Sequence, residues 1–211
     1  MPSTLVHVAI SGLLAAALLR EEFGWRSLLV VLGSTAFLDL DAFVGLVLPG
    51  AHRSLFHSLF VPLVLSLGLV LETNRKQSVL EERFDGRGRR VGSVAILAVA
   101  VGGIGPDLVT NGVNLLYPLT DTFVQFDGAL KLSSTQGIVQ TFVEPTGQDG
   151  SKVVVGSSRT IHYSTGVNPR RGTEPESVER VFPIVRSGLQ LLLVLASATV
   201  VSFRLWEERG T

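Results

Sequence analysis

Hydrophobic residues are concentrated in five stretches of the chain, and polar segments separate them. Apolar residues fill nearly all positions of each stretch rather than one stripe, a pattern typical of helices in lipid or in a deep core. A bilayer-spanning helix needs about 17–25 such residues. The stretches cover residues 5–19, which is short for a span, 27–48, 55–71, 91–119 and 189–205. We expect the fourth to break near its glycines and proline at 102–106.

The segment 120–186 has a different pattern, because it is polar and carries short runs of β-prone residues between turn residues. Asp127-Gly128 is a two-residue hairpin signal, so we expect strands on both sides of it. The expected strands are 123–126, 129–132, 138–143, 152–155 and 159–163, with a turn around 147–150 and a helix start near Glu174.

Together these patterns predict an all-α polytopic membrane helix bundle of about five hydrophobic helices, with a small β-rich extramembrane insertion. Residues 1–119 are expected to form the membrane helical core, residues 120–186 a β-rich cap outside the membrane, and residues 187–211 a C-terminal transmembrane helix with a short tail. A soluble all-α bundle is the alternative for the shorter hydrophobic runs.

Composition strengthens the membrane interpretation and excludes several functions. Charged residues make up 17% of the chain, below the roughly 25% of soluble domains, and the mean hydropathy is +0.42. Formal net charge is zero, so we expect no nucleic-acid partner. The chain has no cysteine, which excludes disulfides, thiolate nucleophiles and cysteine-ligated zinc.

Basic residues predict the orientation, because lysine and arginine are enriched on the cytoplasmic side of membrane proteins. Arg204 lies at the end of the fifth stretch, and Arg209 follows it. The connection between the third and fourth stretches holds Arg75, Lys76, Arg83, Arg87, Arg89 and Arg90. We therefore expect a multi-pass protein of the inner (cytoplasmic) membrane, with the loop around His52 and the β-rich cap on the outer face.

Six acidic and histidine side chains lie in or beside the hydrophobic stretches. A central aspartate costs roughly 2.5–3.5 kcal/mol to insert, so such residues usually face the bundle interior and have a partner. The candidates are His7, Asp39, Asp41, His52, His57 and Asp107. Helix caps and hydrogen-bonded structural histidines are the alternative for each one alone. In the predicted orientation all six lie at a similar depth near the outer face.

A mixed histidine and aspartate site without sulfur suits a divalent metal, with zinc expected first and manganese or iron as alternatives. A bound metal would lower the pKa of its water towards ~7, which is the chemistry of hydrolysis. Arg53, beside the histidines, is suited to hold an anionic group of the substrate. Asp41 and Asp107 are candidates for a catalytic base. His162 in the cap is a further candidate ligand.

The order of these residues resembles the membrane-bound metal-dependent hydrolases, which include the LexA-regulated inner-membrane-associated putative hydrolases. The matching elements lie within roughly residues 1–119. They are Thr4-Leu-Val-His7, Asp39-Leu-Asp41, His52-Arg53 with His57-Ser58, and Asp107-Leu-Val-Thr110 ahead of Gly112 and Tyr117-Pro118. The combination of the histidine element with the upstream Asp-x-Asp is fairly specific, whereas each element alone is weak.

The resemblance implies metal-assisted hydrolysis of a phosphoester, with membrane lipids as surroundings and a lipid or small phosphoester as substrate. The chain departs from the family at Gly102 and Gly103, where the family commonly has a Ser-His pair. One ligand of the implied set is therefore missing, and His162 is the candidate replacement. A transporter or ion relay and a catalytically inactive metal-binding membrane protein are the alternative functions.

Overall fold

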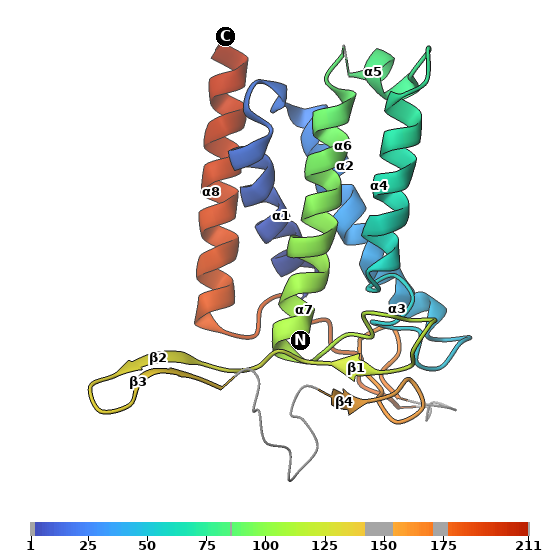
Figure 1. Cartoon of the computed structure of the whole chain (residues 1–211), viewed down its shortest axis with the longest axis vertical. Coiled ribbons are helices and arrows are strands. Elements are labelled where there is room, and N and C mark those ends of the chain that lie inside the picture. The colour runs from blue at the N-terminus through green and yellow to red at the C-terminus, as the bar shows by residue number, and fades with distance from the viewer. Residues whose placement is uncertain (1–2, 85, 142–153, 171–176, 211) are drawn as a thin grey trace. The chain divides into compact units, whose positions relative to one another are not determined.

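The computed structural model describes residues 3–84, 86–141, 154–170 and 177–210 (Figure 1). The chain divides into two compact units. The helix unit consists of Pro2–Leu40, Leu59–Pro106 and Phe182–Thr211, and the loop unit of Asp41–Ser58 and Asp107–Val181. The loop unit thus combines residues 41–58 with the polar segment. The predicted domain boundaries at residues 119 and 186 separate membrane from extramembrane parts, and they stay a prediction.

Long apolar helices dominate the helix unit. Three helical runs, Trp25–Val44, Gly88–Thr110 and Gly188–Gly210, are long and apolar enough to cross a bilayer, and two more apolar helices are shorter. This supports the predicted polytopic helical membrane protein. The elements are α1 (Thr4–Leu18), a 3₁₀ turn (Arg20–Glu22), α2 (Trp25–Ala36), a 3₁₀ turn (Phe37–Leu40), α4 (Phe60–Thr73), α5 (Val79–Arg83), α6 (Gly88–Leu97), a π-helical segment (Ala98–Ile104) and α8 (Gly188–Gly210).

Small residues let the helices of this unit approach closely. Helix α1 packs against α8, α2 and the π-helical segment, while α6 packs against α2 and α4 (Figure 1). Where α1 meets α8, the Ser197 hydroxyl donates to the backbone oxygen of Ala9 at 2.7 Å, opposite Gly12. Large apolar side chains such as Leu63 on α4 and Leu192 on α8 are exposed, as expected of residues that contact lipid.

The fourth hydrophobic stretch does not break at its glycines, so this expectation was wrong. Its helical turns continue from Gly88 through the π-helical segment into α7 (Gly105–Thr110). The wider π turns accommodate Pro106, which has no N–H to donate. The glycines serve close packing instead: a Cβ on Gly102 would overlap the Ser11 hydroxyl, and one on Gly103 would overlap the Leu38 side chain.

The loop unit contains short helices and four short strands. Its helices are α3 (Asp41–Val44) and most of α7. The strands are β1 (Phe123–Val124), β2 (Leu130–Ser133), β3 (Gly137–Gln140) and β4 (Val154–Gly156). They form two antiparallel pairs, β1 with β4 and β2 with β3. Because each sheet has only two strands, loops connect most of this unit.

The predicted hairpin at Asp127-Gly128 was wrong, because β1 pairs with β4 rather than with β2. The observed hairpin joins β2 and β3, where the Ser133 hydroxyl accepts from the backbone N–H groups of Thr135 and Gln136. Gly137 closes this turn with a φ of 71°. Residues 159–163 form a turn and irregular chain instead of the predicted strand. The predicted turn at 147–150 and helix start near Glu174 lie outside the described residues.

The close packing at the π-helical segment generates a stability prediction. Gly102→Ala is expected to lower the free energy of unfolding by about 1–3 kcal/mol, because the new methyl group must displace Ser11. The measurement is thermal unfolding of the detergent-solubilised protein. Gly68→Ala in α4 is the matched control, since a Cβ there meets nothing within 4 Å. Equal melting temperatures for the two variants would contradict the packing role of Gly102.

Candidate functional site

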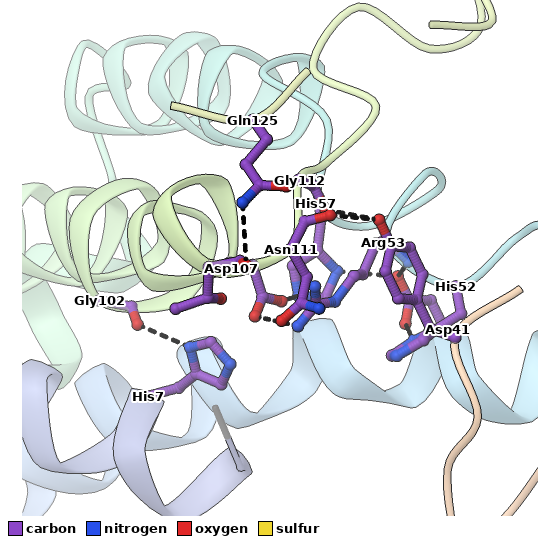
Figure 2. Close-up of polar contacts among 12 residues, drawn as sticks. His7, Asp41, His52, Arg53, His57, Gly102, Asp107, Asn111, Gly112 and Gln125 are labelled. Atoms are coloured by element: carbon purple, nitrogen blue, oxygen red, sulfur yellow. Dashed lines mark hydrogen bonds and ion pairs between the residues drawn. The ribbon is translucent and has the colours of Figure 1, made fainter. Parts of the chain in front are cut away.

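A buried carboxylate organises the residues that the sequence marked as a site. Asp41, at the start of α3, is fully buried. Its Oδ1 accepts a hydrogen bond from His52 Nδ1 at 2.6 Å, and its Oδ2 accepts one from His57 Nδ1 at 2.8 Å (Figure 2). An ionised carboxylate only accepts, so both imidazoles carry their proton on Nδ1 and direct Nε2 elsewhere.

Arg53 is held by its backbone as well as by its side chain. Its φ of 62° lies in the left-handed region, which is uncommon for residues other than glycine. The backbone N–H of Arg53 donates to Asp41 Oδ2 at 2.9 Å, and its carbonyl accepts from the backbone N–H of Asn114 at 2.9 Å. Such a conformation costs about 1–3 kcal/mol, and these two hydrogen bonds offset that cost.

The Arg53 guanidinium is buried but only partly satisfied. Its Nη2 donates to Asp107 Oδ1 (Figure 2). The guanidinium carbon lies 4.6 Å from the centre of the Tyr163 ring. Within the described residues, its Nε and Nη1 are buried and have no hydrogen-bond partner. Unsatisfied donors of a buried arginine are costly, so they indicate a place for the oxygens of an anionic group.

Asp107 connects the arginine to the second histidine. It lies in the first turn of α7 and is almost fully buried. One of its oxygens pairs with Arg53, and the other lies 3.4 Å from His57 Nε2. His57 therefore lies between two carboxylates, Asp41 at Nδ1 and Asp107 at Nε2. We call Asp41, His52, Arg53, His57, Asp107 and Tyr163 the Asp41 cluster.

Sequence reasoning did not find Tyr163. Its hydroxyl donates to the backbone oxygen of Asn111 at 2.7 Å, and its ring packs over Arg53. Burial raises the pKa of the Tyr163 phenol; the nearby Arg53 charge acts to lower it, but the net effect remains upward. A lone tyrosine in a polar segment carries no pattern that would mark it. His162, the neighbouring residue, stays a prediction as a replacement ligand.

His7 and Asp39 belong to the helix unit, whereas the Asp41 cluster belongs to the loop unit. His7 is buried in α1, and its Nδ1 lies 2.9 Å from the backbone oxygen of Gly102, to which it donates. Asp39 is half-buried in the 3₁₀ turn Phe37–Leu40. The structure thus brings Asp41, His52, His57 and Asp107 together, and His7 and Asp39 stay predictions as ligands of the same site.

The Asp41 cluster fits a metal ion in its chemistry but does not complete a site. Histidines that bind a metal usually donate their other ring nitrogen to a carboxylate, as His52 and His57 do to Asp41. The 3.4 Å between His57 Nε2 and Asp107 Oδ2 equals the ~3.4 Å between two ligands of tetrahedral zinc. However, the described residues contain no group of three or more such side chains arranged around one ion. The predicted divalent metal therefore stays a prediction.

A second hydrogen-bond network, around Asp121, supports the backbone of Arg53. Asn114, whose N–H holds the Arg53 carbonyl, donates from its side chain to Asp121 at 2.8 Å. Asp121 also accepts from the backbone and hydroxyl of Ser158, at 2.9 and 2.7 Å. Burial acts to raise the pKa of Asp121, but these hydrogen bonds and the nearby Arg159 charge outweigh it and hold the pKa below 3.8.

A carboxyl group with a lowered pKa stabilises the fold above its ordinary pKa, and this contribution is lost as the pH falls through the lowered value. Asp121→Asn should therefore reduce the melting temperature at pH 7, by about 2–4 °C. The difference from the unsubstituted chain should shrink below the ordinary pKa of an aspartate, towards pH 3, because protonation removes the charge. Thermal unfolding at both pH values measures this. Asp127→Asn, at an exposed position of the same segment, is the control. A decrease in the melting temperature of Asp121→Asn that is the same at both pH values would contradict a stabilising role of the Asp121 charge.

In comparisons with known proteins, no family model, no curated protein and no solved structure matches this chain. The functional argument therefore rests on the cluster itself: a buried carboxylate that orients two imidazoles beside an arginine with two free donors.

Proposed function

We propose that this chain is a membrane-bound hydrolase that acts on a phosphoester or lipid-like substrate at the membrane surface. The observation that carries the proposal is the buried Arg53, whose Nε and Nη1 have no partner among the described residues. An anionic phosphoester would supply the missing acceptors, because a guanidinium matches two phosphate oxygens at once. The resemblance to membrane-bound metal-dependent hydrolases supports the same chemistry.

The residues of the cluster suggest how hydrolysis would proceed. Arg53 binds the non-bridging oxygens of the anionic phosphoester. His57, with its proton on Nδ1, accepts a proton from water at Nε2 while the water oxygen bonds to phosphorus and the bond to the leaving oxygen breaks. The proton then passes from His57 to the leaving oxygen. Asp41 keeps the imidazole in this tautomer and stabilises its cationic form.

Asp107 fixes the two reacting side chains relative to each other. It pairs with Arg53 through one oxygen and lies 3.4 Å from His57 through the other. The predicted zinc, manganese or iron would polarise the phosphoryl oxygen and activate water when bound. His52, through its Nε2, and Asp107 are the residues of the cluster with the chemistry to hold it, because Nε2 of His57 serves as the base.

We propose further that α1 and α4 also cross the bilayer, which gives five spans in an inner (cytoplasmic) membrane with the Asp41 cluster on the outer face. The apolar lengths of α1 and α4, 15 and 14 residues, are near or below the lower limit for a span. Apolar residues that flank both helices, such as Leu19 after α1, lengthen the hydrophobic stretch.

The hydrolase proposal predicts separable effects of two substitutions. His57→Ala should lower kcat about 10²–10⁴-fold, because it removes the base. Arg53→Gln should mainly raise KM, because it removes charge from the binding of the anion. Release of p-nitrophenol from p-nitrophenyl phosphate diesters, and of phosphate from phospholipid vesicles, is the measurement. Arg75→Gln is the control, since Arg75 is exposed and pairs only with Glu72 among the described residues.

The outcomes also distinguish the alternatives. Turnover that survives His57→Ala would contradict the proposed base. Binding of the phosphodiester without turnover would instead favour an inactive binding protein. Ion flux through the protein in proteoliposomes would favour a transporter. Elemental analysis tests the metal separately: we expect stoichiometric zinc that His52→Ala loses. A fully active metal-free protein would refute the metal requirement, but the hydrolase proposal would still hold.

The orientation has a direct test, because the chain contains no cysteine. A single cysteine at exposed Ser134, in the β2–β3 turn, should react with a membrane-impermeant maleimide in intact cells. A cysteine at exposed Lys76, between α4 and α5, should react only after the membrane is permeabilised. The reverse labelling pattern would refute the proposed orientation, whatever the activity of the protein.

A further inference from the structure

A groove in the helix unit combines basic and apolar side chains. It lies where the end of α1 meets the beginning of α6, and its volume is about 530 Å³. Arginines line one part of it, and apolar residues line the other. The lining residues that matter here are Arg87, Arg89 and Arg90, followed by Leu18, Val94 and Leu97. None of them belongs to the Asp41 cluster.

Local contacts neutralise only part of the basic charge. Arg90 pairs at 3.3 Å with Glu22, the one acidic residue among the described residues that line the groove, and donates to the backbone oxygen of Leu18 at 3.0 Å. Arg87 donates to a backbone oxygen, that of Glu21. Within the described part of the chain, the exposed Arg89 guanidinium takes part in no ion pair. The groove therefore has an excess of positive charge.

The arrangement along α6 separates charge from apolar surface. Arg89 and Arg90 lie in the first turn of the helix, Val94 follows one turn later, and the exposed Leu97 about two turns later. Residues four apart lie on the same face of a helix, so the basic part continues directly into an apolar strip. A ligand that fits both parts has an anionic end and a hydrocarbon chain.

Two exposed tryptophans indicate that the end of the helix unit that carries the groove lies at a membrane–water interface. Trp25, at the start of α2, is 59% exposed, and Trp206, near the end of α8, is 70% exposed. Gly24 lies beside Glu208, so these two helix ends are neighbours. The arginine Arg87 lines a cavity together with Trp25 and Glu208. Exposed tryptophans are typical of the headgroup level of a bilayer.

We propose that this groove binds a phospholipid with an anionic headgroup. The phosphate and headgroup charge pair with Arg87 and Arg89, and an acyl chain lies along Leu18 and Leu97. Charge complementarity favours an anionic over a zwitterionic lipid, and the apolar strip favours a lipid over free phosphate. Basic pockets between membrane helices are suited to such headgroups.

The test measures lipid binding to the full-length protein by native mass spectrometry from detergent. Phosphatidylglycerol should bind more tightly than phosphatidylcholine of the same acyl chains. Because each arginine near a charged membrane surface contributes about fivefold in affinity, Arg87→Gln with Arg89→Gln should weaken phosphatidylglycerol binding roughly 25-fold. Arg75→Gln, a substitution outside the groove, should leave it unchanged.

A competition experiment decides whether the groove binds a lipid or only a phosphate group. Glycerol phosphate, which has no acyl chain, should not compete with phosphatidylglycerol at equal concentration. Competition by glycerol phosphate would show an anion site and overturn the proposal of a lipid site. Equal affinity for phosphatidylglycerol and phosphatidylcholine would also overturn the proposal. So would a loss of phosphatidylglycerol affinity in Arg75→Gln as large as that in the double variant. Melting temperatures without added lipid show whether the double variant is folded.

Discussion

The loop unit depends on the burial of one ionised carboxylate. An unpaired charge in such a place costs several kcal/mol, so Asp41 is tolerated only because three N–H groups donate to it. Those three donors belong to residues of the candidate site: two imidazoles and the backbone of Arg53. One buried charge thereby fixes the tautomers of both histidines and the unusual conformation of the arginine.

Arg53 links this charge to the polar segment of the chain. Its N–H is bound by Asp41 and its carbonyl by Asn114, whose side chain is bound to Asp121. Its guanidinium lies under Tyr163. Residues between 107 and 181 therefore shape the site as directly as those between 41 and 58, and the contacts join both segments into one compact unit.

Patterns of polarity predicted the long apolar helices, because an apolar run of membrane length has few other stable surroundings. They also marked Asp41, His52, Arg53, His57 and Asp107, since such side chains are costly in apolar surroundings. The strand pairing was not predictable, because β1 pairs with a strand thirty residues away and local turn signals cannot encode that partner. Tyr163 was missed for the same reason: its role comes from tertiary packing over Arg53.

The glycine pair in the π-helical segment has an evolutionary consequence. The resemblance implies a histidine near position 103, but the space for a side chain there is filled by Leu38. A change from glycine to histidine must therefore be accompanied by a smaller residue at position 38, and the two sites are expected to vary together among relatives. A Gly103→His substitution alone would therefore place its side chain against Leu38.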